Sequence, residues 1–184
     1  LGLTQLVEAN MVPVWLDVTL DGRPEPVWVT HEGLFSVQPG PDGEPSLIEL
    51  EAPIAAKTGE GAPLVASTVD VDGDGVLEII RVENYIQVLR VSDVNTLSLD
   101  KVPQPTLPGV TLRDMAVGDL NADGLSDIVV GFAIRSPSER AENSGFPDQI
   151  LMNIGHGRFE LVPVDPPHDG YTNGITLGDV DGDG

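Results

Sequence analysis

A short acidic motif recurs along the chain at intervals of 49 to 60 residues. Residues 70–78 read DVDGDGVLE and residues 119–127 read DLNADGLSD, so both follow the pattern D-x-[DN]-x-D-G-x-x-[DE]. The sequence DVDGDG at 179–184 matches the first six positions, and DVTLDGRPE at 17–25 is a weaker match with Thr19 at the third position. A spacing of this size predicts a repeat architecture in which each copy is one structural unit.

Each acidic loop is flanked by short apolar segments that are typical of β-strands. They are rich in β-branched residues and alternate with turn residues, and no window of helix length keeps a 3.6-residue apolar period. The expected strands are 12–16, 26–30, 33–37 and 46–50; 63–69, 79–83, 85–91 and 96–100; 115–118, 128–134, 149–153 and 158–164; and 175–178. Four antiparallel strands per repeat are typical of a propeller blade.

The expected fold is therefore an all-β, partial β-propeller over residues 1–184, with about three four-stranded antiparallel blades and the first strand of a fourth. The repeats span approximately 12–53, 63–105, 112–164 and 172–184. Because a propeller closes with roughly four to eight blades, we expect this chain to be a fragment of a larger ring. Trp15 and Trp28 fall in strands of the first repeat, where we expect them to pack between blades.

The spacing of the acidic residues is suited to a hard cation. Side chains at positions 1, 3 and 5 of a tight loop converge on one point, and glycine at position 6 permits a sharp turn. The carbonyl of position 7 and an acid at position 9 then complete the roughly 6–8 oxygen ligands that Ca²⁺ takes. Without a cation the crowded carboxylates would repel one another, so the metal should also add stability.

Two of the four copies are complete. Their predicted ligands are Asp70, Asp72, Asp74, the Val76 carbonyl and Glu78 in one loop, and Asp119, Asn121, Asp123, the Leu125 carbonyl and Asp127 in the other. The C-terminal copy supplies Asp179, Asp181 and Asp183 but lacks positions 7 and 9. The first copy offers Asp17 and Asp21 as weaker candidates, and its Asp-Gly pair alone can turn a hairpin. We expect two calcium sites and an incomplete third.

An EF-hand begins with the same spacing, but it needs an acid at position 12 and a helix on each side. Position 12 is Arg81 in one complete loop and Val130 in the other, and the flanking segments read as strands. These features exclude an EF-hand and dockerin-like helical loops. The remaining alternative is an acidic turn without metal, and the repetition of the motif favours metal binding.

The stretch AVGDLNADGLSDIVVG at 116–131 resembles the FG-GAP repeat of integrin α-subunit propellers and the related bacterial repeats called FG-GAP-like or VCBS. The stretch QILMNIGHGRFE at 149–160 is similar to the hairpin that follows the loop in the bacterial type. The resemblance covers residues 12–184 and implies a β-propeller, commonly seven-bladed, with calcium in loops between the strands of a blade. The Phe-Gly half of the family name is not evident in this chain, and Glu78 stands where the family usually has Asp.

Composition excludes several functions. The chain has 30 acidic residues against 9 basic ones, a net charge of −21, which rules out binding to nucleic-acid phosphates. It has no cysteine, which excludes disulfides and thiolate chemistry, and no apolar run approaches the roughly 18 residues of a membrane span. The G-x-S-x-G, H-E-x-x-H, P-loop and G-x-G-x-x-G motifs are also missing, so we expect no enzyme activity in this segment.

The sequence therefore predicts a calcium-stabilised propeller that acts as a binding or assembly module for protein or glycan partners. Loops of this kind are loaded in millimolar extracellular calcium, so we expect an extracytoplasmic location: secreted, periplasmic or at the cell surface. We also expect it to be part of a longer chain or a larger assembly. Two alternatives stay open. One is the propeller domain of a secreted polysaccharide lyase or lipid hydrolase, with catalytic residues outside this segment; the other is a lectin-like module.

Overall fold

A computed structural model of the chain describes residues 11–53, 64–82, 86–100, 111–133, 148–163 and 172–179. These residues form twelve strands and no helix, so they contain no helix able to cross a membrane. The strands are β1 (Val12–Leu16), β2 (Glu25–Val29), β3 (Leu34–Pro39), β4 (Pro45–Leu50), β5 (Val65–Val69), β6 (Glu78–Val82), β7 (Ile86–Asp93), β8 (Thr96–Leu99), β9 (Thr111–Gly118), β10 (Asp127–Ala133), β11 (Gln149–Asn153) and β12 (Phe159–Pro163).

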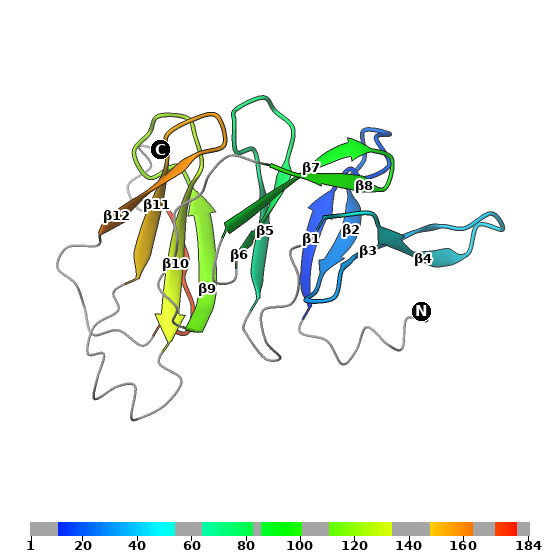
Figure 1. The fold of residues 1–184 in the computed structure, drawn as a ribbon, viewed down its shortest axis with the longest axis horizontal. Helices are drawn as coiled ribbons and strands as arrows, with labels where there is room; N and C mark the ends of the chain where they lie inside the picture. The colour runs from blue at the N-terminus through cyan, green and yellow to red at the C-terminus, as the bar shows by residue number, and fades with distance from the viewer. Residues whose placement is uncertain are drawn as a thin grey trace.

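The strands form three sheets of four strands each, and within every sheet the strand order follows the chain (Figure 1). We call them sheet 1 (β1 to β4), sheet 2 (β5 to β8) and sheet 3 (β9 to β12). All neighbouring strands are antiparallel. The predicted all-β class and the four-stranded antiparallel sheets are thus confirmed. β9 begins four residues earlier than expected, and its pairing with β10 shifts register between Gly131 and Phe132.

Sheet 2 is buried on both faces because it lies between the other two sheets. Ile79 on β6 belongs to an apolar cluster shared with sheet 1, which also contains Val14 and Val27. The next residue, Ile80, faces the other way and belongs to a cluster shared with sheet 3. Alternation along a strand places successive side chains on opposite faces, so β6 is apolar at both. The first strands of the sheets are neighbours, β1 beside β5 and β5 beside β9.

One end of every sheet carries the acidic motif. The connections β1–β2, β5–β6 and β9–β10 lie along the upper edge of Figure 1. Because antiparallel strands alternate in direction, the turn from the third to the fourth strand returns to the same end. We call this end, formed by residues 17–24, 70–77 and 119–126 with the turns at 94–95 and 154–158, the loop end.

Two expectations of the sequence analysis are wrong. The segment 175–178 is not a strand, since the Ile175 amide donates to Asp114 Oδ2 at 2.7 Å instead of joining a ladder. Trp15 does not pack between sheets and is 60% exposed. Its neighbours Val14 and Leu16 face sheet 2, so the alternation of β1 turns Trp15 to the opposite face.

Candidate metal-binding loops

The three acidic loops at 17–25, 70–78 and 119–127 share one backbone conformation. Each has positive φ at its fourth and sixth positions. These residues are Leu20, Gly73 and Ala122 at the fourth position and Gly22, Gly75 and Gly124 at the sixth. The sixth-position φ values are 85°, 86° and 86°, a region that favours glycine. The glycine at the sixth position of the motif is therefore explained by the positive φ that the turn requires there. The shared φ pattern indicates that the three loops turn in the same way.

The first aspartate of each loop holds the turn closed by accepting backbone N–H groups. Asp70 Oδ1 accepts from Gly73 and Asp74 at 2.8 and 3.1 Å, and Asp70 Oδ2 accepts from Gly75 at 2.8 Å. The first aspartates of the other two loops bind the fifth and sixth amides in the same manner. In loop 119–127 these donors, that of Gly124 foremost, hold the pKa of the Asp119 carboxyl below its usual range.

The ninth-position carboxylate ties the end of each loop to its beginning. It accepts the N–H of the second residue in all three loops. The pairs are Glu25 Oε2 with Val18 at 3.0 Å, Glu78 Oε2 with Val71 at 2.8 Å, and Asp127 Oδ2 with Leu120 at 2.9 Å. Glu25 was not among the predicted site residues, although position 9 of the motif is the signal that could have found it.

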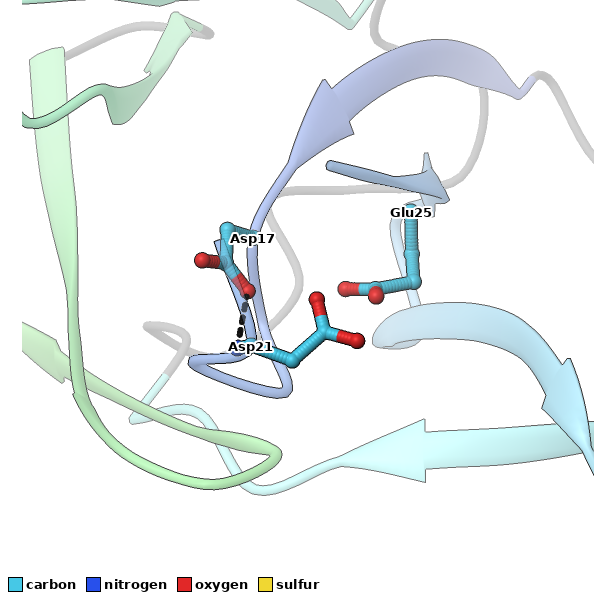
Figure 2. A group of neighbouring side chains, drawn as sticks. All are labelled: Asp17, Asp21 and Glu25. Carbon is cyan, nitrogen blue, oxygen red and sulfur yellow. Dashed lines mark hydrogen bonds between the residues drawn. The ribbon is translucent and has the colours of Figure 1, made fainter. Parts of the chain in front are cut away.

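Three carboxylates converge in each of two loops. Ligand oxygens of Asp70, Asp72 and Glu78 all lie within 4.8 Å of one another. The same holds for Asp17, Asp21 and Glu25, where Glu25 at the start of β2 faces the two aspartates of the loop (Figure 2). The weaker sequence candidates Asp17 and Asp21 therefore also converge, with Glu25 as the third member.

Loop 119–127 is arranged differently at its ninth position. Asp127 is fully buried, and its Oδ1 accepts the backbone N–H of Asn153 at 2.7 Å while its Oδ2 accepts the backbone N–H of Leu120. Asn121 Nδ2 donates to Asp123 Oδ2 at 2.9 Å, so these two side chains lie together. Asp127 is one methylene shorter than Glu25 and Glu78 and is held at both oxygens, and this loop is not one of the two convergent groups.

The other predicted aspartate ligands are exposed or lie outside the described residues. Asp74 is exposed, and its Oδ1 accepts the N–H of Val76 at 2.8 Å. Asp123 Oδ1 accepts the N–H of Leu125 at the same distance, which repeats that geometry. Asp179 is described and exposed. The predictions for Asp181 and Asp183 lie outside the described residues.

The oxygen donors of these loops are of the kind that hard cations prefer. The convergent carboxylates of loops 17–25 and 70–78 thus fit an ion such as Ca²⁺. The carboxylate and amide oxygens of loop 119–127 fit such an ion as well. In loop 70–78 a guanidinium already lies among these oxygens: Arg90 Nη1 is 2.6 Å from Glu78 Oε1 and 2.9 Å from Asp72 Oδ2. Arg90 was not among the predicted site residues, because it lies on β7, outside the motif.

Comparison with known proteins places the third loop in a family. Residues 119–184 match the sequence profile described as FG-GAP-like repeat. Residues 119–184 thus carry an FG-GAP-like repeat. The FG-GAP-like repeat begins at the first ligand position of the loop and includes β10, β11 and β12, so the resemblance stated on the motif is confirmed there. No curated protein sequence matches the chain.

The fold is similar to that of an Agrocybe aegerita lectin, described by its specific recognition of non-reducing terminal N-acetylglucosamine. The TM-score is 0.52 with 19% identity over 84% of this chain. The match spans only 38% of the lectin chain. At this identity the likeness shows the fold alone.

Asparagines join successive acidic loops through the carbonyl of the second loop residue. Asn95, in the β7–β8 turn of sheet 2, donates its backbone N–H to the Val18 carbonyl of the loop in sheet 1 at 2.7 Å. Asn153, at the end of β11 in sheet 3, donates from Nδ2 to the Val71 carbonyl of sheet 2 at 2.8 Å. Loops 17–25 and 70–78 are therefore fixed to the sheet that follows each of them, and both asparagines lie outside the acidic motif.

The electrostatics of loop 70–78 centre on Glu78, whose side chain is 2% exposed. Burial raises the pKa of the Glu78 carboxyl to about 7, although the Val71 amide and the Arg90 guanidinium act in the opposite direction. Burial acts to lower the pKa of Arg90, but the attraction of its carboxylate partners outweighs this, so the pKa of Arg90 is raised. Glu78 and Arg90 thus form a close, partly buried ion pair.

Proposed function

We propose that this protein is a non-catalytic binding module, built as a β-propeller, whose acidic loops bind calcium. The observation that carries the proposal is the recurrence of one loop conformation at the same end of three consecutive sheets, with three carboxylates converging in two of the loops. Converging carboxylates repel one another when no cation is present. A divalent cation relieves this repulsion and stabilises the turn.

Two features support reading the three sheets as propeller blades. The first strands of consecutive sheets are neighbours, and sheet 2 is packed on both faces, as an interior blade of a propeller is. In this arrangement the loop end forms one face of the disc, and all three acidic loops lie on that face.

The loop end also supports a role in binding. Several large apolar side chains are exposed there rather than buried. They are Leu20, Val76, Leu77, Val94, Leu120 and Ile154. Exposed apolar groups that cluster on one surface mark interaction sites more often than scattered ones do. We propose that the loop end contacts a protein or glycan partner, and the recognition of terminal N-acetylglucosamine by the lectin of similar fold makes a glycan the first candidate to test.

An extracytoplasmic location is part of the proposal. Carboxylate loops of this type are filled at the millimolar calcium concentrations found outside cells, whereas many stay empty at cytosolic concentrations. The excess of 30 acidic over 9 basic residues agrees with a surface that gains from bound divalent cations. Removal of calcium is therefore the direct test of the function.

Calcium removal is expected to lower the melting temperature of the protein. At a calcium concentration 100-fold above Kd, one site adds about 2.7 kcal/mol, which for a chain of this size corresponds to roughly 5–10 °C. Melting should be followed by circular dichroism in 2 mM calcium and in EGTA, with magnesium as the control ion. Retention on immobilised glycans ending in N-acetylglucosamine, measured under the same two conditions, tests the partner. Equal melting temperatures with and without calcium would contradict the proposal.

A further inference from the structure

Arg90 lies where a cation bound by loop 70–78 would have to lie. Its Nη1 is 2.6 Å from Glu78 Oε1 and 2.9 Å from Asp72 Oδ2, and both residues belong to the convergent group of that loop. Its Nε is 3.2 Å from Asp100 Oδ2, which fixes the guanidinium from the other side. One side chain of this protein thus already supplies positive charge to two of the three gathered carboxylates.

The register of the strands shows that this arrangement is particular to sheet 2. The pairing of Ile79 with Leu89 places Arg90 across from Glu78. In sheet 3 the pairing of Ile128 with Leu151 places Met152 across from Asp127. In sheet 1 the corresponding residue, across from Glu25, is Gln38. Among the three loops with this conformation, the position across from the ninth residue is therefore basic in one and uncharged in the other two.

A guanidinium and a divalent ion cannot share these oxygens. A calcium ion bound to Asp72 and Glu78 would lie about 2.3–2.6 Å from their carboxylate oxygens. Arg90 Nη1 occupies nearly the same distance from both oxygens, so the ion and the guanidinium would overlap and repel each other. Glu78 is almost fully buried, and a buried carboxylate requires a positive partner or a proton. Only one of the two, the calcium ion or the Arg90 guanidinium, can be the positive partner of Glu78 at a time.

We propose that Arg90 is the resident cation of loop 70–78, which lets this loop keep its shape without metal and weakens calcium binding there relative to the other loops. The inference rests on the proposed function, since it concerns competition for a calcium site. Calcium enters loop 70–78 only when the guanidinium leaves Asp72 and Glu78. The loops of one chain therefore differ in their need for metal: loop 70–78 is stabilised internally, and loops 17–25 and 119–127 depend on the ion.

The test compares Arg90→Met, which copies the residue of sheet 3, with wild-type protein and with Arg90→Lys, which keeps the charge. Arg158→Met removes a positive charge from the exposed β11–β12 turn and serves as the matched control. Calcium titrations of ¹⁵N-labelled full chains report each loop separately through the amide resonances of Gly75 and Gly124. Melting in EGTA reports the metal-free stability of each variant.

In Arg90→Met we expect the calcium concentration at which the Gly75 resonance is half-shifted to be at least ten-fold lower than in wild type. The corresponding concentration for Gly124 should stay unchanged. We also expect a lower melting temperature in EGTA, which calcium restores. Arg90→Lys should lie between this variant and wild type, and Arg158→Met should match wild type. If Gly75 titrates at the same calcium concentration in wild type and Arg90→Met, the inference is overturned while the proposed function stands.

If no loop titrates with calcium in any variant, the proposed function fails and the melting data in EGTA decide the remaining part of the inference. A lower melting temperature for Arg90→Met than for Arg90→Lys and Arg158→Met would then still show that the guanidinium is the resident cation. Equal melting temperatures would overturn that part too. If Arg90→Met folds poorly, Arg90→Lys still decides the question. A melting temperature in EGTA that is lower in Arg90→Met but not in Arg90→Lys attributes the loss to the missing positive charge.

Discussion

Asn153 connects two acidic loops through one buried side chain. Its Nδ2 donates to the Val71 carbonyl of loop 70–78 at 2.8 Å and to the Ser126 carbonyl of loop 119–127 at 3.2 Å. Its Oδ1 accepts the N–H of Gly155 at 2.9 Å, and the residue is 2% exposed. Few side chains could make all of these contacts, because they require two donors and an acceptor in one planar group.

Replacing Asn153 with alanine is expected to lower the free energy of unfolding by about 2–4 kcal/mol. Each buried polar group left without its partner costs about 1–3 kcal/mol, and this change removes the donor to two carbonyls. Urea unfolding in EGTA measures the loss without any contribution from bound metal. Asn173→Ala, at an exposed position, is the control and should be close to neutral. A loss below about 0.5 kcal/mol for Asn153→Ala would mean that the link between the loops contributes little.

The sequence predicted the site residues that lie within the motif and missed those that pairing brings to it. Asp70, Asp72 and Glu78 share a nine-residue pattern, so their meeting is a local property of the turn. Arg90 and Asn153 reach the loops only through strand register and sheet packing, which a single sequence does not reveal. Both lie in segments that the sequence predicts to be strands, yet nothing in their spacing marks them as partners of a carboxylate or a carbonyl.

At the scale of elements, the positions of the strands could be predicted from the short apolar runs, but segment 175–178 was predicted to be a strand and is not one. Short β-branched runs between turn residues identified all twelve strands to within a few residues. Segment 175–178 has the same composition, but its backbone is held by side chains: the Ile175 amide donates to Asp114 Oδ2. A strand needs a partner along its length, and an apolar run alone does not show whether one is present.

Gly131 on β10 provides the space in which this segment lies. A methyl group added at Gly131 would be 2.5 Å from Thr172 Cγ2 and 2.8 Å from Ile175 Cδ1. The Thr172 amide donates to the Phe132 carbonyl beside it at 3.2 Å. The absence of a side chain at residue 131 is therefore required for segment 172–179 to pack against sheet 3.

Gly131→Ala is accordingly expected to displace the segment and to destabilise the protein by about 1–3 kcal/mol, the usual effect of overpacking. Hydrogen exchange gives the sharper measurement: the Ile175 amide should exchange at least ten-fold faster than in wild type. Gly178→Ala is the matched control, since a methyl group there meets no other atom within 4 Å. Unchanged protection of Ile175 in Gly131→Ala would show that the side chains of the segment adjust without moving its backbone.

At the scale of the whole molecule, the repeat period predicted three similar sheets, and packing explains why they lie side by side. β6 is apolar on both faces, so a single sheet of this kind cannot cover its own surface. The next sheet supplies the cover, and the asparagines Asn95 and Asn153 fix the neighbours in register at the loop end. The number of sheets that complete the arrangement is set by the angle between neighbours, which no sequence pattern encodes directly.

The charge of the whole molecule leads to a prediction about salt. A net charge of −21 on 184 residues produces mutual repulsion that opposes the compact state. Screening shortens the range of this repulsion from about 30 Å at 0.01 M salt to about 8 Å at 0.15 M. In EGTA, raising KCl from about 20 mM to about 500 mM should therefore increase the melting temperature by several degrees, roughly the effect of 1–2 kcal/mol.

Calcium should reduce this dependence on salt, because bound ions neutralise the carboxylates that lie closest together. The melting temperature measured at the same KCl concentrations in 2 mM calcium is thus expected to rise less than in EGTA. NaCl in place of KCl controls for effects specific to one cation. A melting temperature that falls with salt would contradict the prediction, since it would mean that attractive pairs such as Arg90 with Glu78 outweigh the repulsion among the 30 acidic residues.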